Sequence, residues 1–208
     1  MPGRYFILNT MEFNSNIKLL VGLGNPGQKY ANTYHNAGFL ALDYLVKQTK
    51  LNNWRVLKSK NFACQEINNL KLVKPLAFMN ESGKAVSQAL KFFRLSPEEM
   101  LVVHDDSDLN LGDFKLSFDR GSAGHHGVES IIRTLKTKSF WRFRVGIRRK
   151  SEMRNEKLEI RRAGLPTVVR LRRTRAKDFV LKKITLADKK ILYGVFGAIV
   201  KLIEKESP

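Results

Sequence analysis

Residues 17–27 read IKLLVGLGNPG, an apolar run that leads directly into a glycine-rich turn. Gly22, Gly24 and Gly27 stand at the spacing of the G-x-G-x-x-G signature of dinucleotide-binding turns. That signature predicts a strand, a tight turn and a helix, and it points to a nicotinamide or flavin enzyme. The residues around the three glycines test this interpretation.

The dinucleotide interpretation fails on two neighbouring features. It requires an acidic residue about 20 positions further on, at the end of a second strand, to bind the ribose. Asp43 stands near that distance, but it lies inside a helical pattern that runs from Phe39 to Val46. Pro26 also removes a backbone N–H that a phosphate cradle would use. We therefore expect no dinucleotide to bind at this turn.

The composition is that of a globular protein. The chain has 208 residues, enough for one domain with a sizeable core, with 43% hydrophobic and 27% charged residues. No uncharged apolar run approaches the ~20 residues that span a bilayer, so no membrane association is expected. Cys64 is the only cysteine, which excludes an internal disulfide and favours a cytoplasmic location. Residues 1–16 show no secretory pattern and are treated as an extension, with Met1 and Met11 both open as the start.

The net charge of +19 is high and unevenly distributed. Together with a sequence pI near 10.2 it favours a polyanionic partner, nucleic acid before membrane, bound through its phosphates. Between Arg148 and Lys177 twelve Lys and Arg residues stand against three Glu. This short stretch therefore carries nearly half of the positive excess.

Strand patterns alternate with helix patterns along the chain. Strands are expected at 18–21, 62–67, 70–74, 100–104, 114–118 and 143–147, with a turn at 68–69. Helices are expected over 39–46, 82–93 and 128–135, and after a capping box at 185–188. This order predicts one α/β domain over 17–205, a single mixed sheet with helices on both faces.

Five polar residues follow or end the expected strands, where open α/β sheets place their sites: Asn25, His35, Asn36, Asn80 and Asp105. Each has an ordinary alternative, since His35 can be a surface histidine, Asn80 a helix N-cap and Asp105 a turn cap. All five together favour a catalytic set. A metal site built from His104 and the acidic residues of 105–108 lacks a standard ligand spacing.

Several motifs in register resemble the bacterial-type peptidyl-tRNA hydrolase family. They are GLGNPGxxYxxTxHNxG from Gly22, KPxxFMNxSG from Lys74, HDDxDL from His104, FxRxRxGI from Phe140 and DFVL from Asp178. The resemblance covers about residues 17–148 and 178–205 in the same order. It implies hydrolysis of the ester between a peptide and the 3′ ribose of tRNA by a cytoplasmic monomer that uses no metal or other cofactor.

The resemblance also implies the roles of the polar set. His35 is the general base, Asp105 its orienting partner, and Asn80 holds the water or the oxyanion. The chemistry agrees, because a neutral histidine with a pKa near ~6.5 suits proton transfer from water. A carboxylate on its second nitrogen fixes the tautomer.

Substrate contacts are implied at further positions. The peptide and the tRNA 3′ end are expected to contact Asn25, Tyr30, Met79, His125 and His126. Phosphate contacts are expected from Arg142 and Arg144. The chain departs from the family pattern in three places: Tyr34 replaces an arginine, Ser117 stands where Lys or Arg is frequent, and the loop at 124–127 is one glycine short. That loop leaves His125 as the lid histidine and His126 at an asparagine position.

The largest departure is a basic insertion at about 149–177. Residues 158–162 and 167–171 predict a hairpin around 163–166, and a disordered, solvated loop is the alternative. We hypothesise that this insertion binds tRNA phosphates through Arg170, Arg172, Arg173 and Arg175.

Two classes of function follow from these features. One is the hydrolase, favoured by the intact set of His35, Asp105 and Asn80. The other is a non-catalytic RNA-binding relative, similar to chloroplast intron-splicing factors, favoured by the altered loop and the basic insertion. A pure binding module has no need of the catalytic set, so the hydrolase is the prediction.

Overall fold

The computed structural model describes residues 16–49, 54–149, 157–162, 165–170 and 179–204. Within them the body of the protein is one seven-stranded sheet with the order β2-β3-β4-β1-β5-β7-β6. Its strands are β1 Leu19–Gly22, β2 Arg55–Leu57, β3 Phe62–Ile67, β4 Leu70–Pro75, β5 Met100–Asn110, β6 Phe114–Phe118 and β7 Trp141–Arg148. The four central strands β4, β1, β5 and β7 run parallel, and the outer strands pair antiparallel.

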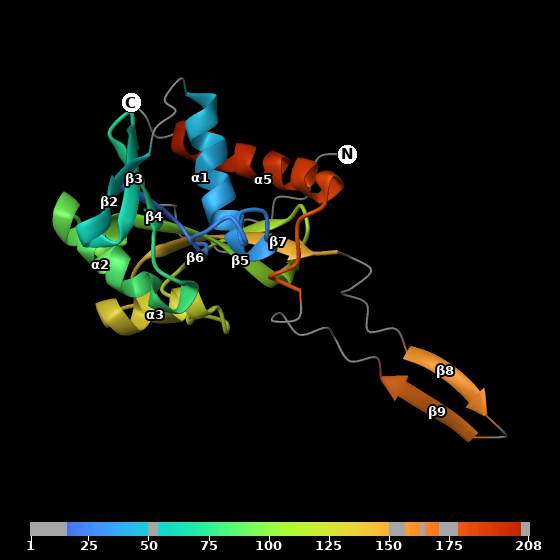
Figure 1. The fold of residues 1–208 in the computed structure, drawn as a ribbon. Coiled ribbons are helices and arrows are strands. Elements are labelled where there is room, and N and C mark those ends of the chain that lie inside the picture. The colour runs from blue at the N-terminus through green and yellow to red at the C-terminus, as the bar shows by residue number, and fades with distance from the viewer. Residues whose placement is uncertain (1–15, 50–53, 150–156, 163–164, 171–178, 205–208) are drawn as a thin grey trace.

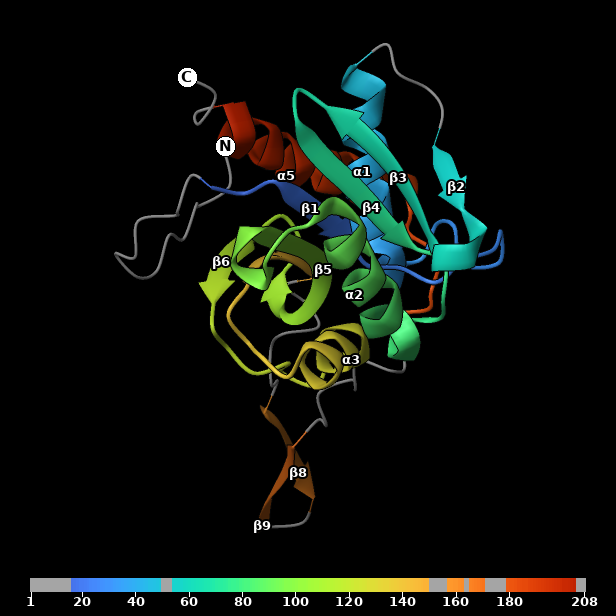
Figure 2. The same cartoon turned by 90° about the vertical axis from the view of Figure 1, so that its left-hand side faces the viewer.

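Helices cover both faces of this sheet (Figures 1 and 2). Helices α1 (Ala37–Gln48) and α5 (Leu186–Glu204) lie on one face, and α2 (Ser82–Phe93) and α3 (His126–Leu135) on the other. The core divides in the same way, with Leu42 and Phe196 in one apolar cluster and Val86 and Ile131 in the other. The predicted α/β architecture is confirmed. None of the described helices is long and apolar enough to cross a membrane.

The central strand β1 shows why the chain folds this way. Successive side chains of a strand point to opposite faces, so a strand covered on both sides reads as a continuous apolar run. Leu20 packs under α1 and α5, whereas Leu19 and Val21 pack under α2 and α3, and all three are fully buried. The carboxyl ends of β1, β4 and β5 meet at one edge of the sheet.

Helix α1 begins directly against that edge because residue 38 has no side chain. A Cβ on Gly38 would lie 2.3 Å from the backbone nitrogen of Leu23 and 2.3 Å from the carbonyl oxygen of Val103. Only glycine permits this approach. The short 3₁₀ turn η1 (Tyr34–Asn36) immediately precedes α1, so the same contact fixes where His35 enters the fold.

Some boundaries match the prediction and others do not. Helix α2 has the predicted bounds, and Asn68 and Asn69 adopt the expected left-handed turn with φ of 46° and 68°. The strand expected to end at 104 continues to Asn110, with a register shift between 106 and 110. Asp105 therefore lies within a buried strand and does not follow one.

The basic insertion contains the predicted hairpin. Strands β8 (Lys157–Arg162) and β9 (Leu165–Arg170) pair antiparallel as a separate two-stranded sheet, with Lys157 opposite Arg170. Both strands begin earlier than expected. Arg172, Arg173 and Arg175 lie outside the described residues, as does the expected extension up to residue 15.

Candidate active site

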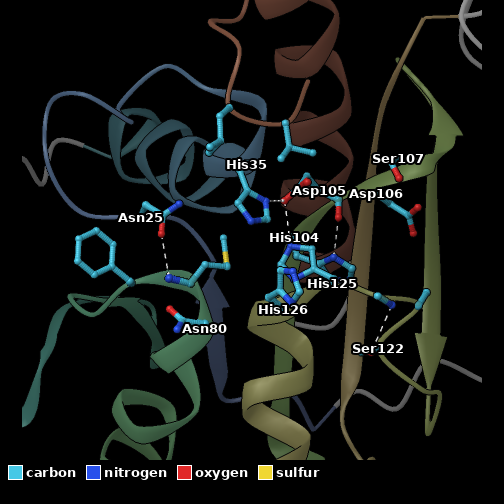
Figure 3. A pocket seen from close by; sticks show the side chains of 16 residues that line it. Asn25, His35, Asn80, His104, Asp105, Asp106, Ser107, Ser122, His125 and His126 are labelled. Atoms are coloured by element: carbon cyan, nitrogen blue, oxygen red, sulfur yellow. Dashed lines mark hydrogen bonds and ion pairs between the residues drawn. The ribbon is translucent and has the colours of Figure 1, made fainter. Parts of the chain in front are cut away.

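A cavity of about 510 Å³ opens beside the carboxyl ends of β1 and β4 and the continuing strand β5 (Figure 3). All four histidines of the chain line it. The predicted site residues among its walls are Asn25, His35, Met79, Asn80, Asp105, His125 and His126. Residues that lie on separate segments of the sequence thus meet around one space.

His35 and Asp105 form a direct pair at this cavity. The Nδ1 atom of His35 lies 2.8 Å from Oδ1 of Asp105, which is 3% exposed. The backbone nitrogen of His35 donates to the carbonyl oxygen of Val180 at 2.8 Å. His35 is therefore held both through its ring and through its backbone. Nε2 of the ring remains for substrate chemistry.

His125 settles which nitrogens carry protons. It is the N-cap of α3, and its Nδ1 accepts from the backbone nitrogens of Gly127 and Val128 at 3.2 and 3.3 Å. An acceptor nitrogen is unprotonated, so the proton sits on Nε2, which donates to Oδ1 of Asp105 at 3.0 Å. The ionised carboxylate accepts from His35 as well, which leaves Nε2 of a neutral His35 as a free base.

The pKa directions agree with this assignment. Burial lowers the pKa of His35, but the charge and hydrogen bond of Asp105 outweigh it, so the pKa lies above its ordinary value. Burial raises the pKa of Asp105, but His35 and His125 hold it far below its usual range. His104 is fully buried, which keeps its pKa well below the ordinary value. Asp105 is thus the charged member of the set, and His104 beside it is neutral.

The same three side chains have the spacing of a metal site. Ligand atoms of His35, Asp105 and His125 all lie within 4.8 Å of one another. A metal on Nε2 of His125 would require its proton to move to Nδ1, which faces two N–H donors. The donor geometry therefore fits a hydrogen-bonded set better than a metal centre. Of the acidic residues of 105–108, Asp106 is already bound to another side chain, since it accepts from Nε of Arg144 at 2.5 Å.

Asn25 ties the glycine-rich turn to the segment after β4. Its Oδ1 accepts from the backbone nitrogen of Met79 at 2.9 Å, at the start of the 3₁₀ turn η3 (Met79–Glu81). Asn36 holds the backbone of Asn25 with two bonds of 2.9 Å. Asn25 is thus fixed through its oxygen, while its amide nitrogen has no protein partner among the residues the structure describes. Asn80 is exposed at the cavity wall, and the residue before α2 is Glu81, so the N-cap alternative for Asn80 does not hold.

Arg142, one of the two expected phosphate-binding arginines of β7, is buried. Arg142 is 2% exposed and donates from Nη1 to the carbonyl oxygen of Gly121 at 2.8 Å. Burial, followed by the charge of Arg144, lowers its pKa to about 10. The expected phosphate contact of Arg142 does not fit this buried position. Ser117 lies opposite it in the sheet and is also buried, so neither side chain can reach a phosphate on the surface.

Tyr30 and Tyr34 are not walls of the cavity. Tyr30 packs edge-on against Phe78, with ring centroids 6.4 Å apart, and so supports a cavity residue from behind. Tyr34, which stands where the family has an arginine, is 8% exposed and lies in a small apolar cluster with Phe179. His126 does line the cavity, at its exposed margin.

The sequence analysis did not predict the apolar cavity residues Phe78, Val180 and Leu181. Phe78 and Leu181 are 55% and 51% exposed, unusual for large apolar side chains, and the carbonyl oxygen of Val180 accepts from the backbone nitrogen of His35. Phe78 stood inside a motif and was open to prediction. Leu181 stood inside the DFVL motif as well, but nothing local indicates that residues 179–184 return to the turn that bears His35.

The fold and the site define a class: a single-sheet α/β protein with a histidine–carboxylate base at the strand ends, as in hydrolytic enzymes. A model of the peptidyl-tRNA hydrolase family matches residues 19–206, and the chain belongs to this family. Among curated relatives, the peptidyl-tRNA hydrolase of Mycoplasma capricolum is 43% identical over 133 residues, which cover 63% of this chain and 72% of the relative. That of Aquifex aeolicus is 45% identical over 139 residues, 64% and 70% of the two chains.

Solved structures agree with this assignment. The crystal structure of peptidyl-tRNA hydrolase from Acinetobacter baumannii superposes with a TM-score of 0.73 at 28% identity, covering 93% of this chain and 89% of that one. A complex of peptidyl-tRNA hydrolase with N-propanol gives the same TM-score and identity, over 94% and 92% of the chains.

Proposed function

We propose that this protein hydrolyses the ester bond between the peptide and the 3′ ribose of peptidyl-tRNA, which recycles tRNA from stalled translation. The observation that carries the proposal is the free Nε2 of His35 at the cavity, with Nδ1 held on Asp105 at 2.8 Å. The named relatives are peptidyl-tRNA hydrolases, so the non-catalytic alternative is not favoured. We propose further that the protein acts as a cytoplasmic monomer without a cofactor.

The reaction uses the protein's own groups. Nε2 of His35 takes a proton from a water molecule whose oxygen attacks the ester carbonyl carbon, and a tetrahedral oxyanion forms. Asp105 stabilises the resulting imidazolium through Nδ1. The amide of Asn80, with the free amide nitrogen of Asn25, donates to the oxyanion. The bond from carbon to the ribose 3′ oxygen then breaks, and the imidazolium returns its proton to that oxygen.

Binding of the substrate divides between apolar and basic surfaces. Met79, Phe78 and Leu181 form apolar walls for the peptide and the 3′-terminal nucleotide. Among the expected phosphate contacts, Arg144 is retained, although its charge is already paired with Asp106. Phosphate contacts are also expected from the insertion arginines Arg170, Arg172, Arg173 and Arg175. The buried Arg142 is no longer expected to contact phosphate.

The test is release of an N-acetylated amino acid from its tRNA by purified protein, with His35→Gln as the matched variant. A glutamine at this position retains polar contacts but has no titratable base, so we expect turnover to fall by on the order of 10³-fold or more while tRNA binding remains. Addition of a chelator should leave the rate unchanged. Tight tRNA binding by the native protein without turnover would instead identify a non-catalytic RNA-binding relative.

A further inference from the structure

Asp188 is a buried carboxylate outside the catalytic set. It lies in the first turn of α5 and is 3% exposed. It accepts from the hydroxyl of Tyr34, from Nη2 of Arg149 at 2.8 Å and from Nε of Arg149 at 3.3 Å. Burial raises the pKa of Asp188, but these hydrogen bonds and that of Thr185 hold it below its ordinary value. We call Tyr34, Asp188 and Arg149 the Asp188 cluster.

The Asp188 cluster adjoins the catalytic base through Tyr34. Tyr34 and His35 are successive residues of the turn η1, and they face different surroundings. His35 lines the cavity, whereas the ring of Tyr34 packs with Ile147, Phe179 and Val180. The Tyr34 hydroxyl is therefore a second anchor of the same turn, on the side away from the substrate.

Backbone bonds fasten this turn to the segment that enters α5. The backbone nitrogen of His35 donates to Val180, and the backbone nitrogen of Ile184 donates to the carbonyl oxygen of Asn32, both at 2.8 Å. Thr33 and Lys183 form an antiparallel bridge between the same two segments. The side-chain hydrogen bonds of Tyr34 and Arg149 to Asp188 add to these contacts at the beginning of α5. Figure 1 shows the backbone of the segment that leads into that helix.

Arg149, at the N-terminal end of the basic insertion, belongs to the Asp188 cluster through its bonds to Asp188. It follows Arg148, the last residue of β7, and is the first residue of the insertion. Residue 179, which follows the insertion, belongs to the cluster around Tyr34. Arg149 and Phe179, the described residues on the two sides of the insertion, therefore both lie at the turn that carries His35.

We propose that Tyr34, Asp188 and Arg149 are positioning residues, whose hydrogen bonds hold the turn 34–36 so that His35 faces Asp105. The proposal rests on the proposed function, in which His35 is the base. Its chemical content is that a carboxylate remote from the substrate sets the geometry of the base through a tyrosine hydroxyl, without contact with the reacting atoms.

The test compares Tyr34→Phe with Tyr44→Phe. Tyr44 also packs against α5, with its ring 5.3 Å from that of Tyr193, but it is not part of the Asp188 cluster. We expect Tyr34→Phe to lower kcat about tenfold with KM nearly unchanged, because His35 loses its alignment while the surface that binds the substrate stays the same. Tyr44→Phe should retain the parent kcat. Arg149→Gln, at a half-exposed side chain, should act like Tyr34→Phe.

The second readout is the pKa of His35, measured by NMR titration of its imidazole without substrate. Two titratable side chains of the described residues contact the ring of His35: Asp105 on β5, which raises the His35 pKa, and His125 before α3, with ring centroids 5.0 Å apart. A loosened contact with Asp105 should lower the His35 pKa in Tyr34→Phe. The proposal requires both changes, and an unchanged kcat or an unchanged His35 pKa in folded protein overturns it. Because the titration needs no turnover, failure of the proposed hydrolysis is seen separately, in the native protein.

Discussion

Oδ1 of Asp105 accepts hydrogen bonds from two histidines, and this sharing determines what each histidine can do. His125 is also the N-cap of α3, so the helix, and not the substrate, fixes the tautomer of His125. Among the described residues the ring of His35 has no such second hydrogen-bond partner, so its Nε2 can exchange a proton at the cavity. The sequence placed both histidines at the site, but it did not predict that His125 shares Asp105 with His35, because hydrogen-bond partners cannot be read from spacing.

Replacing Asp105 by Asn tests this arrangement at the residue scale. The acid limb of kcat/KM should lie above the ordinary histidine pKa of ~6.5, because His35 must lose its proton to act and its pKa is raised. In Asp105→Asn the attraction is lost and burial alone remains, so the limb should move to lower pH. The plateau should fall by on the order of 10³-fold, because the Asn amide favours the wrong tautomer.

The measurement is a pH profile of kcat/KM for both proteins, with tRNA binding as the control for folding. An acid limb that stays at the same pH in Asp105→Asn would show that a group other than His35 titrates. An unreduced plateau would show that the carboxylate does not support the base.

At the scale of elements, the site depends on how closely α1 approaches β1 and β5. The contact at Gly38 brings the first turn of α1 against the backbone of two strands, and η1 with His35 lies just before it. Apolar periodicity predicted α1, α2 and the central strands well, because burial on a helix face or on both sides of a strand leaves a local pattern. The close approach at Gly38 leaves no pattern, since it depends on atoms 15 and 65 positions away.

Gly38→Ala is the corresponding variant, and Gly194→Ala is its matched control. A Cβ at 38 would meet backbone atoms at 2.3 Å, whereas a Cβ at 194, inside α5, meets nothing within 4 Å. We expect Gly38→Ala to destabilise the fold by about 3 kcal/mol, with loss of activity as α1 and the turn of His35 shift. Gly194→Ala should stabilise by about 1 kcal/mol through helix propensity.

Urea unfolding midpoints, compared at an unchanged slope, measure both effects. If Gly38→Ala were as stable and active as the parent, the helix would not rest on the strands as closely as the structure describes. If Gly194→Ala were destabilising, the space beside α5 would be occupied.

At the scale of the whole molecule, positive charge and catalytic chemistry occupy different parts of the chain. The catalytic set comes from residues 25–105, while nearly half of the charge excess lies in 148–177. The sequence predicted the hairpin and the charge, because both are local properties. It did not predict that the two flanks of the insertion meet at the turn of His35, since that follows from the packing of β7 and α5. Burial likewise removed Arg142 from the phosphate-binding set, although its motif position suggested otherwise.

The insertion should bind tRNA phosphates, and the salt dependence of tRNA binding tests it. Replacing Arg170, Arg172, Arg173 and Arg175 by Ala should weaken binding and reduce the slope of log K against log salt by roughly one unit for each lost phosphate contact. The matched control replaces four exposed lysines of the body by Ala: Lys47, Lys58, Lys91 and Lys201. Both proteins lose the same net charge, so a general field effect would change both slopes alike. A slope that changes only in the insertion variant identifies direct phosphate contacts there, and an unchanged slope, or equal changes in both variants, would remove the insertion from the tRNA-binding surface.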